Sequence, residues 1–428
     1  MEFLSATTGQ WSPVKKILFR FFFVYFFLYC FPFPVDSFEF TKPVAQPVYN
    51  FWDWLVLGVS YKWFHIRATT AFPMFDKMDD SGYGVVFILL NLLFSGITTI
   101  WWSLADQRRK NYEKLYHWMK LYLRYYLAAY LFGYGFIKVF PSQFEPITAS
   151  NLVMQVGDQS PMMLAWNFMG YSTAMMRFTG IVEVGAGVLL LFRRTATLGA
   201  IVSFSVFSYV VLMDFCFNVP VRLLASHLLL ISLFLTLEDA HRLLNIFFLN
   251  KPTQATVPVA ITEHAGLQKV LIMTQVVIAL SLVYSTVVKS IDEEKTIGHK
   301  TPPVPLYGIY NTVYFIKNKD TLPFRDTDNF RWKQLVVDGP SWKQPGSIQF
   351  TSDKRNFYTI QTDSIKKILT LKSNSDTTEK YFLHYYIQDR DHLLLKGKFR
   401  QENIETLMSR YDLNNYLLHK EKFTWIKD

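Results

Sequence analysis

The sequence contains few cysteines and lacks the short motifs that mark common cofactor sites. Only Cys30 and Cys216 occur in its 428 residues, and both lie in apolar stretches, where a free thiol behaves as a small hydrophobic side chain. We therefore expect no disulfide. The chain has no Walker A sequence, no G-x-G-x-x-G after a predicted strand, no C-x-x-C and no H-E-x-x-H. These absences exclude the usual nucleotide and zinc signatures, predict no metal site, and leave open whether the protein is an enzyme.

The formal net charge of +10 does not indicate a nucleic-acid partner. No basic helix carries interleaved base-reading side chains, and much of the basic excess lies in loops or in the C-terminal part. Short cytoplasmic loops of membrane proteins collect Lys and Arg. We therefore expect the lipid bilayer, and no nucleic acid, among the partners.

Apolar residues are concentrated in residues 1–290, whereas residues 291–428 have the composition of a water-soluble domain. A helical crossing of the hydrocarbon needs about 20 apolar residues. Seven runs approach this length and predict about seven spans, at residues 17–33, 83–102, 122–140, 171–192, 197–217, 222–237 and 270–288. The expected fold class is an α-helical polytopic membrane protein followed by a small all-β domain.

Loop charges orient these spans, because Lys and Arg favour the cytoplasmic side. With the N-terminus inside, the second connection is cytoplasmic and carries Arg108, Arg109, Lys110, Lys114 and Lys120. The loop 141–170 has no Lys or Arg, as expected outside, whereas Arg193 and Arg194 mark an inside turn. We expect a multi-pass protein of the bacterial inner membrane with a cytoplasmic N-terminus and a periplasmic C-terminal domain.

The external loop 34–82 is rich in tryptophan, which favours the headgroup zone. Residues 50–60 within it are expected to form a short interfacial helix. The run Asp76, Asp79, Asp80 and Ser81 has the residue types of a cation site, but capping of the next span explains it more simply.

Glu183 lies in the middle of the fourth predicted span, where a charge normally has a partner or a function. At helical spacing it shares a face with Gly180 and Gly187, so we expect a seam at which another helix approaches closely. Arg177 flanks this seam and is within reach of Glu183. Two interpretations stay open: a buried ion pair or neutral carboxyl that fixes helix packing, and a carboxylate that handles protons or contacts a quinone.

Other ionisable groups fall in the outer half of the same spans. Lys138 ends the third span below a row of Tyr126, Tyr130 and Tyr134, and we expect its ammonium at the interface. Asp214 and Arg222 bracket a tight turn and are expected to pair with each other. His227 is a packing residue or a proton partner. The candidate site is a polar cluster that converges on an outward-facing cavity for a small amphipathic molecule: Glu183, Arg177, Lys138, Asp214, Arg222 and His227.

Residues 124–244 resemble the DoxX-like family of four-helix membrane proteins. The resemblance rests on the stretches GYGFIK (133–138), FTGIVEVGAGVLLLFRR (178–194), TLGA (197–200) and VPVRLLASHLL (219–229). It implies a four-helix bundle at the centre of the chain. The family takes its name from a subunit of a thiosulfate:quinone oxidoreductase, which implies quinone-linked redox chemistry and a quinone as the possible cofactor.

The C-terminal part contains seven short β-prone runs, at residues 312–316, 333–337, 347–350, 357–362, 367–371, 381–387 and 392–399. The last two flank a predicted hairpin loop, and Asp338-Gly339 supplies another turn. This pattern predicts a small antiparallel barrel or sandwich. Phe423 and Trp425 near the C-terminus are expected to plug a barrel end or to contact a partner.

The predicted domains are N-terminal spans and an aromatic loop (1–116), a DoxX-like bundle (117–250), a cytoplasmic connection with the last span (251–290) and a periplasmic β-rich domain (291–428). The first function hypothesis is a redox-associated membrane protein whose bundle holds a quinone or similar lipid-soluble molecule. The alternative is a non-enzymatic scaffold or lipid-handling protein whose periplasmic domain recruits a protein partner. A transporter of small solutes is a third hypothesis.

Overall fold

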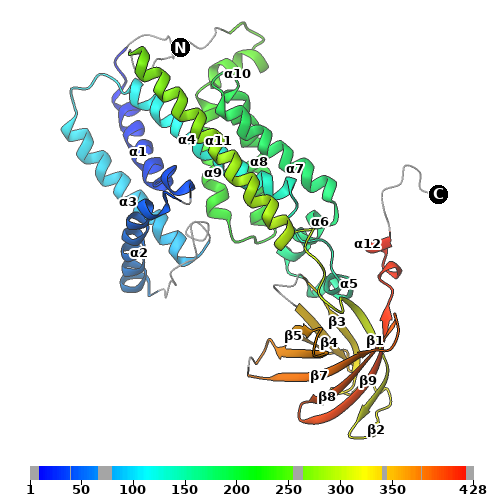
Figure 1. The fold of residues 1–428 in the computed structure, drawn as a ribbon. Helices are drawn as coiled ribbons and strands as arrows, with labels where there is room; N and C mark the ends of the chain where they lie inside the picture. Colours follow the sequence, from blue (N-terminus) through cyan, green and yellow to red (C-terminus); the bar gives the residue numbers. More distant parts are fainter. Residues whose placement is uncertain are drawn as a thin grey trace. The chain divides into compact units, whose positions relative to one another are not determined.

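The computed structural model describes residues 9–38, 40–65, 80–253, 264–339, 345–376 and 378–420 (Figure 1). The chain divides into two compact units. A helical unit comprises Met1–Val139 and Phe178–Lys289, and a barrel unit comprises Phe140–Arg177 and Ser290–Asp428. Each unit is therefore built from two separate stretches of chain.

Helices of 8 to 32 residues make up the described part of the helical unit. They are α1 (Pro13–Cys30), α2 (Lys42–Phe64), α3 (Gly82–Ala105), α4 (Glu113–Val139), α7 (Thr173–Leu191), α8 (Ala196–Cys216), α9 (Arg222–Leu237), α10 (Ala240–Phe247) and α11 (Ala265–Thr296), of which α7 begins and α11 ends in the barrel unit. Ser12 and Ser81 cap α1 and α3, since their hydroxyls accept the backbone N–H groups of Lys15 and Gly84. Both free cysteines lie here, Cys30 buried and Cys216 exposed.

Five segments of the described chain are long and apolar enough to cross a membrane: Pro13–Ser37, Gly82–Ala105, Thr173–Leu191, Ala196–Cys216 and Gly266–Thr296. The pair α9 and α10, bent by 71°, would make a sixth. The prediction of a multi-pass helical part is confirmed in this coarser form. The count of seven stays a prediction, because α4 is not among these segments.

Helix α4 is polar for a membrane helix, yet other helices cover much of its surface. Leu123, Tyr126, Leu127 and Phe132 are among its fully buried side chains. Arg124 donates two hydrogen bonds to the carbonyl of Leu190, at 2.9 and 2.6 Å. A helix satisfied by its neighbours in this way does not need the apolar surface that lipid contact requires.

Hydrogen bonds and ion pairs join the segments between the helices at two separate places in the helical unit. At one end the Arg20 guanidinium donates to the Tyr112 hydroxyl at 3.0 Å, and Lys120 pairs with Glu238. At the other end Asp80 N donates to Pro220 O at 3.2 Å. The predicted alternation of the spans places the same segments together.

The aromatic loop forms a longer helix than the sequence predicts. The expected helix at 50–60 is part of α2 (Lys42–Phe64), which ends where His65 adopts a left-handed φ of 53°. Trp52 is buried against Phe87 of α3, while Trp54 and Trp63 are exposed. The prediction that Ser81 caps the next span is confirmed, and Asp76 and Asp79 lie outside the described residues.

The barrel unit is a closed antiparallel barrel of eight strands. They are β1 (Gly308–Lys317), β3 (Trp332–Val337), β4 (Pro345–Phe350), β5 (Arg355–Asp363), β6 (Ile368–Ser373), β7 (Lys380–Ile387), β8 (His392–Phe399) and β9 (Glu402–Tyr411), and β2 (Asp320–Thr321) adds a short hairpin to β1. Pairing of β1 with β9 closes the barrel. All seven predicted β-prone runs fall on strands, and of the two predicted architectures the barrel is the one observed.

Side chains fill the barrel interior. Trp332, Phe315, Phe350 and Phe399 are fully buried there, as expected for an eight-stranded barrel, whose interior is just wide enough for side chains. Phe423 and Trp425 lie outside the described residues.

Residues 140–177, which include the predicted external loop 141–170 and the start of the predicted span 171–192, belong to the barrel unit. They contain α5 (Ala149–Val153), a 3₁₀ turn (Val156–Asp158) and α6 (Pro161–Tyr171). Thr148 Oγ1 and Ser150 N donate to the buried Asp338 carboxylate at 2.7 and 2.8 Å, and Ala149 packs with Ile309 and Val336 of the barrel wall. Asp338, at the end of β3, therefore anchors this segment to the barrel, while residues 340–344 of the predicted turn region lie outside the described residues.

We predict that Asp389→Asn weakens the β7–β8 hairpin at neutral pH. Hydrogen bonds from the Asp391 N–H, and then from His392, hold the pKa of the Asp389 carboxyl below its usual range. A depressed folded pKa means that the stabilisation is present above the unfolded value of about 3.9 and is lost as the pH falls through the folded pKa. The barrel melting temperature should fall in the variant at pH about 7 and match wild type in strong acid. Asp326→Asn, at an exposed loop residue, is the control, and a difference that persists in acid would contradict the prediction.

Candidate functional site

Lys138 and Glu183 form a buried ion pair between α4 and α7. The Lys138 ammonium donates to both Glu183 carboxylate oxygens, at 2.6 and 2.7 Å. The two side chains are only 8% and 6% exposed. The sequence predicts that Lys138 extends to the interface and that Arg177 lies within reach of Glu183. The first expectation is wrong because a carboxylate lies within the reach of Lys138, and the second because Glu183 is already paired while Arg177 is exposed.

Glycines allow α4 and α7 to approach closely beside this pair. A Cβ added to Gly180 would lie 2.6 Å from Gly135 O, and one added to Gly187 would lie 2.8 Å from the Phe132 ring. Glu183 therefore sits in a tightly packed seam of small residues, the geometry expected from the sequence. The arrangement fixes the packing of two helices and leaves the carboxylate facing protein.

We predict that Gly180→Ala destabilises the helical unit by about 1–3 kcal/mol, the usual effect of overpacking. The added methyl group would meet backbone atoms, which cannot move aside as a flexible side chain does. Unfolding in mixed detergent micelles measures the effect. Gly185→Ala is the control, because a Cβ at Gly185 meets nothing within 4 Å. Equal losses of stability in the two variants would contradict the close packing of α4 against α7 at Gly180.

Asp214 of α8 lies near the same pair but bonds differently from the prediction. It interacts electrostatically with Asp80, Lys138 and Arg222. Among the described residues, its Oδ2 atom is buried without a hydrogen-bond partner. Asp214 is thus an acidic neighbour of the Lys138–Glu183 pair.

Arg222 pairs with Asp80, and the predicted Asp214–Arg222 pair is wrong. Arg222 Nε lies 2.6 Å from Asp80 Oδ2, and the Asp80 carboxylate also accepts the backbone N–H groups of Arg222 and Leu223, at 3.2 and 2.9 Å. Asp80 reaches both because the start of α3 lies beside the first turn of α9. A carboxylate is favourable there, since a helix N-terminus carries positive partial charge.

His227 of α9 is bonded on both ring nitrogens. Nε2 lies 2.6 Å from the Tyr25 hydroxyl, and Nδ1 lies 2.6 Å from Leu223 O. The Tyr29 ring stacks on the imidazole at 4.2 Å between centroids. Of the two interpretations of His227, these contacts describe a hydrogen-bonded packing residue. Neither tyrosine was predicted as a partner, because no sequence pattern indicates that α1 packs against α9.

A row of aromatic rings links His227 to the ion pair. The ring centroids of Tyr29 and Tyr126 lie 6.4 Å apart. The Tyr126 ring lies 5.0 Å from that of Tyr130, which lies 6.4 Å from that of Tyr134. The Lys138 ammonium lies 5.7 Å from the Tyr134 ring centroid. The predicted tyrosine row therefore faces the interior of the helical unit.

A small cavity opens beside this row, between α1, α2, α3 and α4. It has a volume of about 40 Å³. Its wall is mostly aromatic, with the Asp36 carboxyl and the Cys30 thiol as polar exceptions, and the rings come from Tyr29, Tyr49, Trp52, Phe87, Tyr126 and Tyr130. None of the six predicted site residues lines it. Asp36 and Tyr49 were missed because their loop and helix were predicted to lie outside the bundle.

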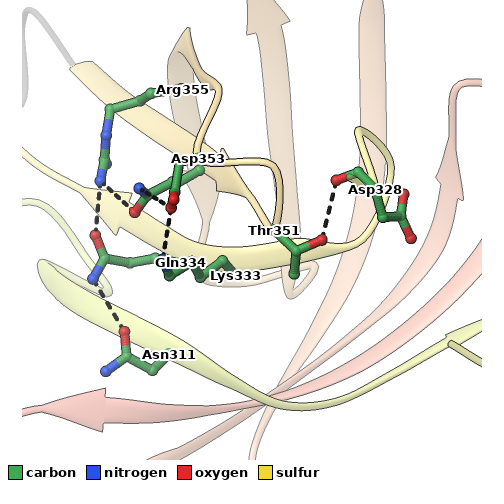
Figure 2. A network of polar contacts seen from close by, with 8 residues as sticks. Asn311, Asp328, Lys333, Gln334, Thr351, Asp353 and Arg355 are labelled. Carbon is green, nitrogen blue, oxygen red and sulfur yellow. Dashed lines mark hydrogen bonds and ion pairs between the residues drawn. The ribbon is translucent and has the colours of Figure 1, made fainter. Parts of the chain in front are cut away.

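The outer wall of the barrel carries a second polar network, shown in Figure 2. Arg355 donates to Gln334 at 3.0 Å and to Gln349 at 2.9 Å, and Gln334 donates to Asn311 at 3.0 Å. Lys333 pairs with Asp353 at 2.6 Å beside it. These side chains come from β1, β3, β4, β5 and the β4–β5 turn, so the network crosses four neighbouring strands.

Comparison with known proteins gives a relative that matches part of this chain. The uncharacterized protein YwoB of Bacillus subtilis (strain 168) is 35% identical to the chain over 124 residues, which is 29% of this chain and 79% of YwoB. No protein-family model matches the chain, and no solved structure matches it. The resemblance to the DoxX-like family therefore stays a prediction.

Proposed function

The chain belongs to the same family as YwoB of Bacillus subtilis, and from that premise we propose that it is a non-enzymatic scaffold or lipid-handling protein of the bacterial inner membrane. In this proposal the helical unit holds the barrel unit on the periplasmic side, where the barrel recruits a protein partner. The shared stretch covers 29% of this chain but 79% of YwoB. Most of this chain is thus an addition to the part that the two proteins share.

The pairing of charges inside the helical unit carries the proposal. The Lys138 ammonium donates to both carboxylate oxygens of Glu183, and the Arg222 guanidinium donates to the Asp80 carboxylate. Lys138–Glu183 is a buried ion pair, and buried ion pairs are best attested as devices that fix register and packing. The paired charges therefore favour a rigid helical unit that carries the barrel.

The barrel supports the same proposal, because its interior is occupied by aromatic and aliphatic side chains. A partner would therefore meet the outer wall, which offers the polar network around Gln334 and Arg355. Polar groups held in fixed positions are suited to specific recognition of another protein surface.

A cysteine-labelling experiment tests the proposed orientation. In a Cys216→Ser background, Ile365→Cys places a thiol at a barrel turn where the native side chain is 94% exposed. Arg194→Cys places one at the basic turn before α8. A membrane-impermeant maleimide should label position 365, and not 194, in intact spheroplasts; the reverse pattern would overturn the proposed topology.

A second experiment tests the scaffold itself. Photo-crosslinkers at Gln334 in the barrel wall and at Lys372 on the far strand β6 are compared in living cells. A defined partner should crosslink at 334, and Arg355→Ala, which removes the guanidinium that also donates to Gln349, should reduce that product. Equal crosslinking at the two positions would contradict a partner-binding site at the polar network of the barrel.

Quinone-linked redox chemistry is the second candidate, favoured by the stacked row from His227 through Tyr126 to Tyr134. Against it, the cavity of about 40 Å³ is far smaller than the roughly 300–1,000 Å³ of typical small-molecule sites. Mass spectrometry of molecules that copurify in mild detergent separates the candidates. Stoichiometric quinone, lost in a folded Glu183→Gln variant, would favour the redox function and overturn the scaffold.

A further inference from the structure

The cavity between α1, α2, α3 and α4 has the composition of a cation site. Rings of Trp52, Phe87, Tyr126 and Tyr130 stand around it, and Asp36 supplies a carboxyl group. The face of an aromatic ring attracts a cation within about 6 Å of its centroid, and aromatic cages recognise ammonium ligands in this way. A carboxylate among such rings adds the opposite charge.

Asp36 is a buried acid with few hydrogen bonds. Its side chain accepts a hydrogen bond from the Tyr49 hydroxyl to Oδ2 at 2.6 Å, a long one from Ser37 to Oδ1 at 3.5 Å, and one from its own backbone N–H. The residue is 4% exposed, and it interacts electrostatically with Lys42 and Cys30. Because a buried carboxylate is costly unless it is paired and well hydrogen-bonded, a cation in the adjoining cavity would be favourable.

Tyr29 is a second and independent sign of a ligand. It lines the cavity and is 1% exposed, and among the described residues its hydroxyl is buried without a hydrogen-bond partner. Buried polar atoms normally have a partner, so such an atom calls for one. A phenol oxygen accepts an N–H donor, which an ammonium group provides.

The size of the cavity selects among ammonium groups. One water needs about 10–15 Å³, so a volume of about 40 Å³ holds roughly three or four atoms of that size. We propose that this cavity binds a primary ammonium group with its first methylene, held by Asp36, by the Tyr29 hydroxyl and by the surrounding rings. The group comes from the headgroup of phosphatidylethanolamine or from a free primary amine. The proposal is independent of what the barrel recruits.

The test uses the full chain in lipid nanodiscs. Retained lipid is measured by mass spectrometry after reconstitution in phosphatidylglycerol mixed with either phosphatidylethanolamine or phosphatidylcholine. Thermal unfolding with added ethanolamine or choline, in phosphatidylglycerol alone, reports on free amines. Retained phosphatidylethanolamine identifies the headgroup as the source, whereas stabilisation by ethanolamine without lipid enrichment identifies a free amine.

Asp36→Asn should reduce the affinity for the ammonium probe about tenfold or more, the scale of one lost hydrogen bond to a charged group. Asp53→Asn is the matched control, because Asp53 also accepts a tyrosine hydroxyl, from Tyr83 at 2.8 Å, but does not line the cavity. If Asp36→Asn does not fold, Trp52→Leu tests the ring wall and should weaken binding several-fold. Binding unchanged in these variants, choline bound as well as ethanolamine, or no binding of either probe would each overturn the proposal.

Discussion

Lys138→Met is expected to destabilise the helical unit by about 3–5 kcal/mol, because it leaves the Glu183 carboxylate buried without its counter-ion. Both side chains are less than one tenth exposed, and the pair is bonded through both carboxylate oxygens. Unfolding in mixed detergent micelles, followed by circular dichroism, measures the loss.

The double variant Lys138→Met with Glu183→Leu is the matched control. It removes both charges and fills similar volume, and such replacements are often neutral or stabilising. We therefore expect it to recover most of the stability lost in the single variant. A single-variant loss within the roughly 0–1 kcal/mol typical of exposed pairs would show that the pair is solvated and the seam open.

Trp332→Ala is expected to destabilise the barrel by about 3–5 kcal/mol, through lost burial and the cavity that remains. Trp332 is fully buried, and its ring packs edge-on against Phe399 at 5.2 Å between centroids. Loss of near-ultraviolet circular dichroism from the barrel on heating or in urea measures the change.

Trp332→Phe separates packing from polarity at this position. Among the described residues, the indole nitrogen of Trp332 is buried without a hydrogen-bond partner, so removing it costs no bond and the phenyl ring keeps part of the packing. We expect a smaller loss than for alanine. Equal losses in the two variants would indicate that the barrel interior does not depend on ring volume.

Local patterns predicted the parts of the fold that depend on neighbours in sequence. The small residues around Glu183 indicated a close helix contact, and β-prone runs located seven of the strands of the barrel. The run 402–411, strand β9, was missed because Glu402, Asn403, Glu405 and Ser409 mask the alternation of Ile404, Thr406 and Met408. It is nevertheless the strand that closes the barrel against β1.

Partners far apart in sequence were not predictable in the same way. Asp214 and Arg222 are eight residues apart across a turn, so pairing them was reasonable, but the observed partner, Asp80, is 142 residues from Arg222. The contacts of His227 with Tyr25 and Tyr29 likewise depend on the packing of α9 against α1. Such contacts follow from tertiary packing, which periodicity alone does not specify.

The hydrogen bond between Thr148 and Asp338 constrains the path of the chain through the bilayer. Bonded residues stand on one side of the membrane, so the intervening chain must traverse it an even number of times. Three described segments in that interval are apolar and long enough on their own, Thr173–Leu191, Ala196–Cys216 and Gly266–Thr296. Three is odd, so an even number requires one more crossing, and among the described residues the pair of α9 and α10, bent by 71°, is the candidate for it. If those three segments each cross the bilayer, we expect α9 and α10 together to form a fourth crossing, a prediction made without any count of loop charges.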